Sequence, residues 1–183
     1  YNEVNVKINK PLTLLGAQAN VACGSRGAES IVQDLTNSGL PVFTINSDDV
    51  TINGFEIIDP WANSGVDAGS TNPNNLTIKF NNIHDIGSSR GSGNVYAVRY
   101  LVGNAVTISN ISITDNCINN VFNSTPSALG NSAGIWFGQS TSTGIINNLI
   151  IDRNIITNIY AGLAGKAASG IDVGTAWNNI TGK

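Results

Sequence analysis

A repeated segment is the feature of this sequence that most restricts its fold. Four stretches superimpose on one another: VTINGFEIID from Val50, LTIKFNNIHD from Leu76, ISITDNCINN from Ile111 and LIIDRNIITN from Leu149. Each has apolar residues at its first and third positions and an isoleucine at its eighth, and PLTLLGAQA opens the same way at Leu12. The copies begin 26 to 38 residues apart. A pattern that holds while its spacing varies predicts fixed strands joined by loops of free length.

Alternating apolar and polar residues within each copy predict β-strands, and the Gly and Asn clusters between copies predict turns. The first, third, eighth and eleventh positions should point inward and form ladders: Val50, Ile52, Ile57, Leu76, Ile78, Ile83, Ile86, Ile111, Ile113, Ile118, Val121, Leu149, Ile151, Ile156 and Ile159. Two successive strands that face one core require a chain that winds as a coil. At the sixth position, Asn81, Asn116 and Asn154 should stack at a corner and satisfy backbone groups of neighbouring rungs.

A further strand precedes each unit. The segments 65–69, 134–138 and 170–174 share the form Gly-apolar-x-apolar-Gly, and 97–100 is a looser copy. The chain should therefore have three sheets.

The Asn ladder, these Gly-flanked strands and the phrase NKPLTLLGA resemble the right-handed parallel β-helix repeats of the pectin-lyase-like superfamily, including its periplasmic copper-processing and carbohydrate-binding repeats. The resemblance covers nearly the whole chain. It implies an all-β fold, a right-handed parallel β-helix (solenoid) with three parallel sheets and about five to six rungs. It implies little about function, because the superfamily includes polysaccharide lyases, glycoside hydrolases, phage tailspikes and adhesins.

Residues 1–183 should form a single domain, since the length leaves no room for a second one. The sequence has strand patterns at both termini and no polar or helical segment that would cap the solenoid there. We therefore expect a segment of a longer solenoid, or ends covered by another subunit, and end-to-end self-association of the isolated chain.

Composition limits the partners. Charged residues make up 11% of the chain, against about 25% in a typical soluble protein, and polarity comes instead from 27 Asn residues and many hydroxyls. A net charge of -3 leaves no basic stripe for nucleic acid or an anionic membrane. No apolar run approaches the ~18 residues of a membrane span, so membrane insertion is not expected. Low charge with abundant Asn, Thr and Ser favours a secreted or cell-surface protein.

The two cysteines leave the redox compartment open. Cys117 lies three repeats beyond the repeat that precedes Cys23, which is roughly 14 Å along the axis at ~4.8 Å per strand. Cα atoms joined by a disulfide lie within about 7 Å of each other. Two free thiols are therefore favoured, and a disulfide requires a loop around residues 18–28 to fold down along the axis.

The outward residues of successive rungs form a column in which neighbouring residues lie about 4.8 Å apart, and such columns are natural sites. The Gly-flanked strands contribute an acid, a cation, an aromatic and a second acid: Asp67, Arg99, Trp136 and Asp172. This column predicts a carbohydrate-binding face, with stacking on the indole and hydrogen bonds to hydroxyls. The ordinary alternative is a set of solvated residues whose opposite charges offset one another.

The resemblance implies a second function, a polysaccharide lyase acting on a uronate polymer. In that case Arg99 would accept the proton and Asp67 and Asp172 would be further catalytic candidates, with Ca²⁺ as a possible cofactor. No metal site or other cofactor is otherwise expected. A third function is a structural fibre or adhesin segment without a small ligand.

Signatures of the superfamily's hydrolases are mostly missing. Only Asp48-Asp49 matches a fragment of the paired-Asp motif, and we interpret it as a turn cap. The sole histidine, His84, should point outward beside Asp85 and is interpreted as non-catalytic.

A column of hydroxyls is expected from the second residues of four units: Thr13, Thr51, Thr77 and Ser112. Such arrays resemble ice-binding surfaces, but the companion column breaks the regularity with charge: Leu15, Asn53, Lys79, Thr114 and Asp152. Strand propensity explains the threonines. We interpret the Asn-x-Ser/Thr sequons at Asn75, Asn110, Asn123 and Asn179 as part of the repeat pattern.

Overall fold

The computed structural model describes residues 3, 5–69, 71–87, 93–122, 130–139, 144–162, 166–174 and 180–182. Strands account for nearly all of the regular structure in these residues, together with one short 3₁₀ turn, η1 (Cys23–Ser25). The strands are β1 (Val6–Ile8), β2 (Leu12–Leu15), β3 (Ser30–Gln33), β4 (Phe43–Ile45), β5 (Val50–Asn53), β6 (Phe55–Ile58), β7 (Ser64–Asp67), β8 (Thr77–Lys79), β9 (Asn82–Ile86), β10 (Val95–Val102), β11 (Thr107–Thr114), β12 (Cys117–Phe122), β13 (Ser132–Gln139), β14 (Ile145–Asp152), β15 (Ile155–Tyr160), β16 (Ala168–Val173) and β17 (Ile180–Gly182).

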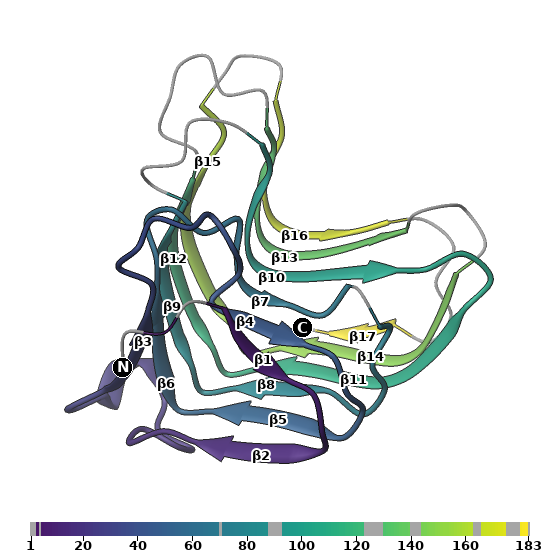
Figure 1. Cartoon of the computed structure of the whole chain (residues 1–183), viewed down its shortest axis with the longest axis horizontal. Coiled ribbons are helices and arrows are strands. Elements are labelled where there is room, and N and C mark those ends of the chain that lie inside the picture. Colours follow the sequence, from purple (N-terminus) through teal and green to yellow (C-terminus); the bar gives the residue numbers. More distant parts are fainter. Residues whose placement is uncertain are drawn as a thin grey trace.

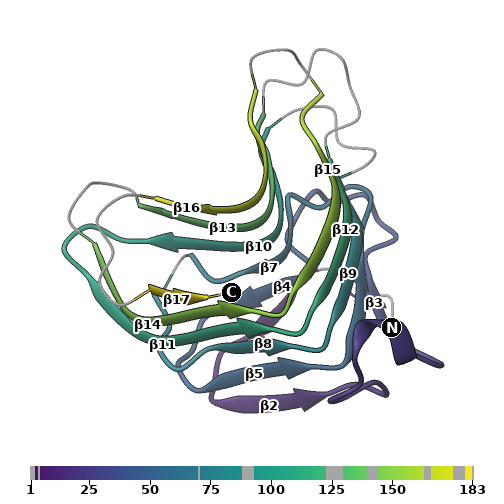
Figure 2. The ribbon, with the colours of Figure 1, turned by 180° about the vertical axis from the view of Figure 1, so that it is seen from behind.

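The strands form three sheets in which every third strand is a neighbour. Sheet 1 has the order β1-β4-β7-β10-β13-β16, sheet 2 the order β17-β14-β11-β8-β5-β2, and sheet 3 the order β15-β12-β9-β6-β3. The pairings within them are parallel. Figures 1 and 2 show three walls, with sheets 1 and 2 facing each other and sheet 3 joining them along one side. The predicted all-β parallel β-helix with three parallel sheets is confirmed.

The solenoid makes about four turns, slightly fewer than the five to six rungs expected. The expectation counted copies of the repeated segment, whereas a turn closes only when the chain returns to the same sheet. The five strands of sheet 3 enclose four such turns.

The core is the set of inward ladders that the repeat predicted. The first and third positions of the four aligned units are fully or almost fully buried, from Val50 at 0% exposure to Ile151 at 6%. The eighth position adds buried Ile57, Ile83 and Ile118, while Ile156 is only partly buried. Close packing of these aliphatic stacks supplies most of the favourable free energy of folding.

Asparagines form the corner between sheets 2 and 3, as predicted. Asn81 and Asn116 are fully buried, and the backbone N–H of each donates to the side-chain oxygen of the next asparagine along the axis, at 3.0 Å. The residue before each, such as Asp115 with a φ of 58°, has a positive φ. The turn therefore leaves backbone groups that the stacked amides satisfy.

A second, exposed side-chain ladder on sheet 2 is formed by the residues that directly precede the aligned units. Asn148 donates to Asn110 at 3.0 Å, Asn110 donates to Asn75 at 2.9 Å, and Asn75 donates to Asp49 at 2.7 Å. All four have positive φ, a backbone conformation that Asn and Asp tolerate better than most residues. The side chains of the described sequon asparagines are thus part of the repeat, and Asn123 and Asn179 lie outside the described residues.

The expectation of two free thiols is wrong. Cys23 and Cys117 form a disulfide with Cα atoms 5.6 Å apart, because the loop between β2 and β3 folds down along the axis. Arg26 holds this loop in place: it donates to the Phe80 carbonyl at 2.6 Å and pairs with Glu29 through two hydrogen bonds of 2.6 and 2.7 Å.

The outer face of sheet 2 has the predicted columns, with Thr51 beside Thr77 and Thr77 beside Ser112. The companion column is also aligned, but Asn53 is not on an open surface, being only 2% exposed. The folded-down loop covers it, and Asn20 exchanges two hydrogen bonds with its side chain.

Candidate functional site

The four predicted site residues lie in one column on the outer face of sheet 1. Asp67 of β7 is the lateral neighbour of Arg99 on β10, and Arg99 is the neighbour of Trp136 on β13. Trp136 in turn neighbours Asp172 on β16. The alignment of 97–100 with the Gly-flanked strands, which the sequence supported least, is therefore correct.

Trp136 provides a flat aromatic surface in this column. Its indole stacks on the ring of Tyr96, with centroids 5.0 Å apart and an interplanar angle of 20°. The indole also lies over Gly138, where a Cβ atom would sit 1.9 Å from Cη2 of Trp136. The second glycine of the Gly-apolar-x-apolar-Gly pattern thus has a specific role here: it leaves room for the indole to lie flat against the sheet.

Arg99 and Asp67 form a tight ion pair next to the indole. Nη1 of Arg99 donates to both carboxylate oxygens of Asp67, at 2.9 and 2.7 Å. The side chains are 26% and 14% exposed, respectively. The guanidinium carbon of Arg99 lies 5.8 Å from the centre of the Trp136 ring, within range of a cation–π contact.

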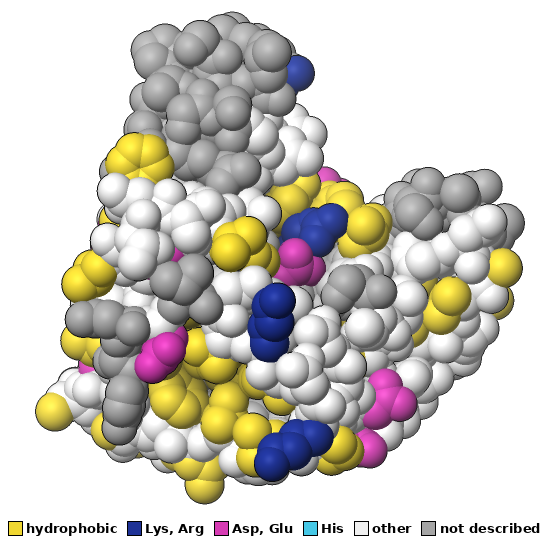
Figure 3. Space-filling view, viewed as in Figure 1, with side chains coloured by type: hydrophobic (Ala, Val, Ile, Leu, Met, Phe, Trp, Pro, Cys, Tyr) yellow, Lys and Arg dark blue, Asp and Glu magenta, His cyan; other side chains and the backbone are white. Residues whose placement is uncertain are grey.

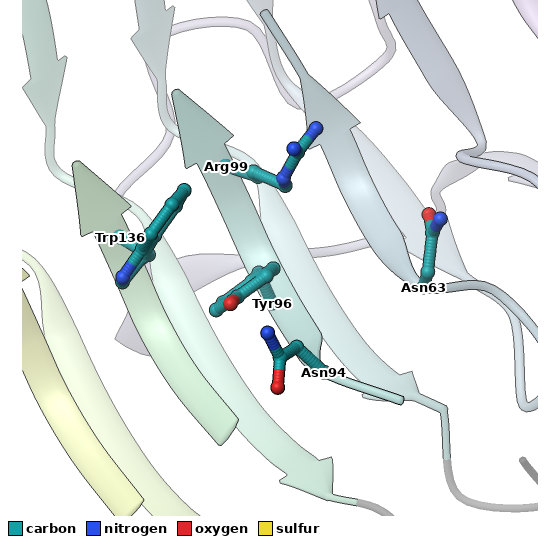
Figure 4. Close-up of a pocket in the computed structure, with 5 residues that line it drawn as sticks. All are labelled: Asn63, Asn94, Tyr96, Arg99 and Trp136. Carbon is teal, nitrogen blue, oxygen red and sulfur yellow. The ribbon is translucent and has the colours of Figure 1, made fainter. Parts of the chain in front are cut away.

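Arg99, Trp136 and Tyr96 line a pocket of about 290 Å³ together with Asn63 and Asn94 (Figure 4). The backbone holds Asn63 near the rings, since the Tyr96 N–H donates to the Asn63 carbonyl at 2.9 Å. Figure 3 shows that this face of the molecule is hollowed, with hydrophobic, basic and acidic side chains meeting in the hollow. The pocket is at the small end of the range for ligand sites, about 300–1,000 Å³, and suits a single ring.

Sequence reasoning missed Tyr96, Asn63 and Asn94. Tyr96 is only 5% exposed because the indole covers it. Burial raises the pKa of its phenol, an effect that Arg99 opposes, so Tyr96 is an uncharged hydrogen-bonding group at neutral pH. The repeat offered no signal for these residues, because they precede the aligned strand positions at a bend that the pattern does not describe.

Asp172 is exposed at the far end of the column. It lies three strand spacings from Asp67, which is roughly 14 Å at ~4.8 Å per strand. Calcium ligands lie about 2.3–2.6 Å from the ion, so these two carboxylates cannot share one Ca²⁺.

The other titratable residues singled out in the sequence have structural contacts. Asp48 accepts a hydrogen bond from the Asn74 backbone N–H at 2.7 Å, a contact between neighbouring rungs and not a cap of its own turn. His84 lies between two carboxylates, with Nε2 2.8 Å from Glu56 and Nδ1 2.7 Å from Asp85. The contacts of Asp48 with Asn74 and of His84 with Glu56 join neighbouring rungs, and these residues do not line the pocket.

Within the described residues, no three His, Cys, Asp or Glu side chains are grouped so as to hold a metal ion. The same part of the chain contains no helix long and apolar enough to cross a membrane. The chain matches no protein-family model, and no curated protein or solved structure gives a match either. Its class is thus defined by the fold, a parallel β-solenoid.

Proposed function

We propose that this chain is an extracellular or cell-surface β-helix module that binds a polysaccharide on the outer face of sheet 1. The observation that carries the proposal is the Trp136 indole, held flat by Gly138 and Tyr96 in a hollow lined by amides. A pyranose presents an apolar C–H face that packs against such a ring, while its hydroxyls match the amide groups at the rim.

Three features support the wider setting of this proposal. The disulfide between Cys23 and Cys117 favours an oxidising compartment, and hence secretion or surface display. The buried Asn ladder between sheets 2 and 3 and the Gly-flanked strands of sheet 1 favour membership of the pectin-lyase-like superfamily.

Binding is favoured over lyase chemistry by the contacts of Arg99. Its Nη1 donates to both oxygens of Asp67, so this part of the guanidinium faces a carboxylate of the protein and not a substrate proton. Its contacts with Asp67 make Arg99 a binding and positioning group instead.

The experiment compares Trp136→Ala with Trp61→Ala in affinity electrophoresis against a panel of soluble polysaccharides. Trp61 is 38% exposed and does not line the pocket, so it controls for loss of a surface indole. We expect Trp136→Ala to abolish retardation and Trp61→Ala to preserve it, with melting temperatures near that of the wild type. Equal retardation of both variants would reject the site, and no retardation of the wild type by any glycan would favour a structural module.

A further inference from the structure

The ion pair beside the indole bears on which sugars the site accepts. Both oxygens of Asp67 receive a hydrogen bond from Arg99, and one of them also accepts the Gly69 backbone N–H at 3.0 Å. The positive charge of Arg99 is thus offset by the Asp67 carboxylate, which Arg99 and the Gly69 N–H hold in place.

The rest of the pocket offers an anionic ligand no compensating charge. Asn63, Asn94, Tyr96 and Trp136 are uncharged lining groups. The next charged residue along the column, beyond Trp136, is Asp172, a second carboxylate. A uronate carboxylate would therefore meet like charges and would have to displace Asp67 from Arg99, at a loss of charge-assisted hydrogen bonds.

We infer that Asp67 is a specificity-determining residue, which pairs with Arg99 so that the site takes neutral sugar rings and rejects uronates. This inference rests on the proposed carbohydrate-binding function and deepens it. Arg99 contributes the cation–π contact and its remaining N–H groups to hydroxyls, and Asp67 keeps the same guanidinium from capturing a carboxylate.

The test is Asp67→Asn, which keeps the size of the side chain and an oxygen for the Gly69 N–H but removes the negative charge. Binding of the wild type and the variant is measured by calorimetry with oligogalacturonate, oligoalginate and a panel of neutral oligosaccharides. We expect the wild type to prefer neutral ligands. We expect the variant to gain uronate affinity on the order of tenfold or more, as for an added charge-assisted pair, and the gain should shrink as salt screens it.

Two matched variants assign the gain to Arg99. Asp172→Asn removes the same charge from the same column without freeing Arg99, and should give a much smaller gain. Asp67→Asn combined with Arg99→Gln should lose the gain, and melting curves establish that each variant is folded.

The outcomes separate this inference from the proposed function. No uronate gain in Asp67→Asn, or wild-type affinity for uronates equal to that for neutral sugars, overturns the role of Asp67. A wild type that binds no neutral glycan contradicts the proposed function. A uronate gain that depends on Arg99 supports the role of Asp67 even in that case, because it shows the carboxylate masking the cation.

Discussion

Replacing Asn116 by Ala tests whether the buried amide ladder holds the rungs together. The Asn116 side chain donates to the Ile78 carbonyl at 2.9 Å and to Asn154 at 2.9 Å. Its oxygen accepts the Asn81 backbone N–H at 3.0 Å and the Asn81 side-chain amide at 3.1 Å. Both of these contacts with Asn81 are buried.

The expected loss follows from the groups that the substitution leaves without partners. The Asn81 backbone N–H would be orphaned in the interior, at a cost of about 1–3 kcal/mol, and each further lost hydrogen bond adds about 0.5–1.5 kcal/mol. We expect a total loss of roughly 2–4 kcal/mol in the free energy of unfolding, since the remaining groups partly re-pair. In a chain of this length that lowers the melting temperature by roughly 4–16 °C.

The assay is urea and thermal unfolding followed by circular dichroism, with Asn119→Ala as the matched control. Asn119 is the same residue type on the same turn, but its side chain accepts exposed hydrogen bonds, from Thr157 and Asn158. The control should lose less than about 0.5 kcal/mol. Equal losses in both variants, or a neutral Asn116→Ala, would refute the role assigned to the ladder.

Four other predictions concern further variants of this chain. Replacing Cys23 and Cys117 by Ser opens a crosslink between residues 94 positions apart and should cost about 4–5 kcal/mol in urea unfolding; an unchanged midpoint would mean that the crosslink does not restrict the unfolded chain. Ile113→Ala removes buried methylenes from a fully buried ladder position and should cost roughly 2–5 kcal/mol, so a loss below that range would place Ile113 outside the core. Burial raises the pKa of the Asp34 carboxyl, but hydrogen bonds from Ser38 and Thr36 outweigh burial and lower the pKa to about 2; the resulting stability is present above pH 3.8 and is lost as the pH falls toward 2. Acid titration of Asp34→Ala should therefore show a shallower loss than the wild type, and parallel curves would contradict the assignment. Gly138→Ala should displace the indole and weaken glycan retardation while leaving the fold intact, whereas unchanged retardation would show that the indole is free to move.

The repeat made the core and the columns predictable because both depend on a local pattern. Ile52, Ile78 and Ile113 face inward since residues of one parity point to one side of a strand, and stacking in parallel register then places them in line. The same periodicity predicts Arg99 between Asp67 and Trp136, which is the order that the strand register of sheet 1 has.

The sequence by itself thus determined the strands, the buried ladders and the order of the site column, all of which follow from a periodicity of two within strands and a pattern that recurs from turn to turn. Only the tertiary structure decided the contacts made by segments outside the repeat. The disulfide of Cys23 depends on a loop that runs along the axis, and the pocket depends on Tyr96 stacking against the indole and on Asn63 across from it. Such contacts have no period, because a loop of free length can reach any neighbouring turn, and the packing of the whole solenoid selects which one.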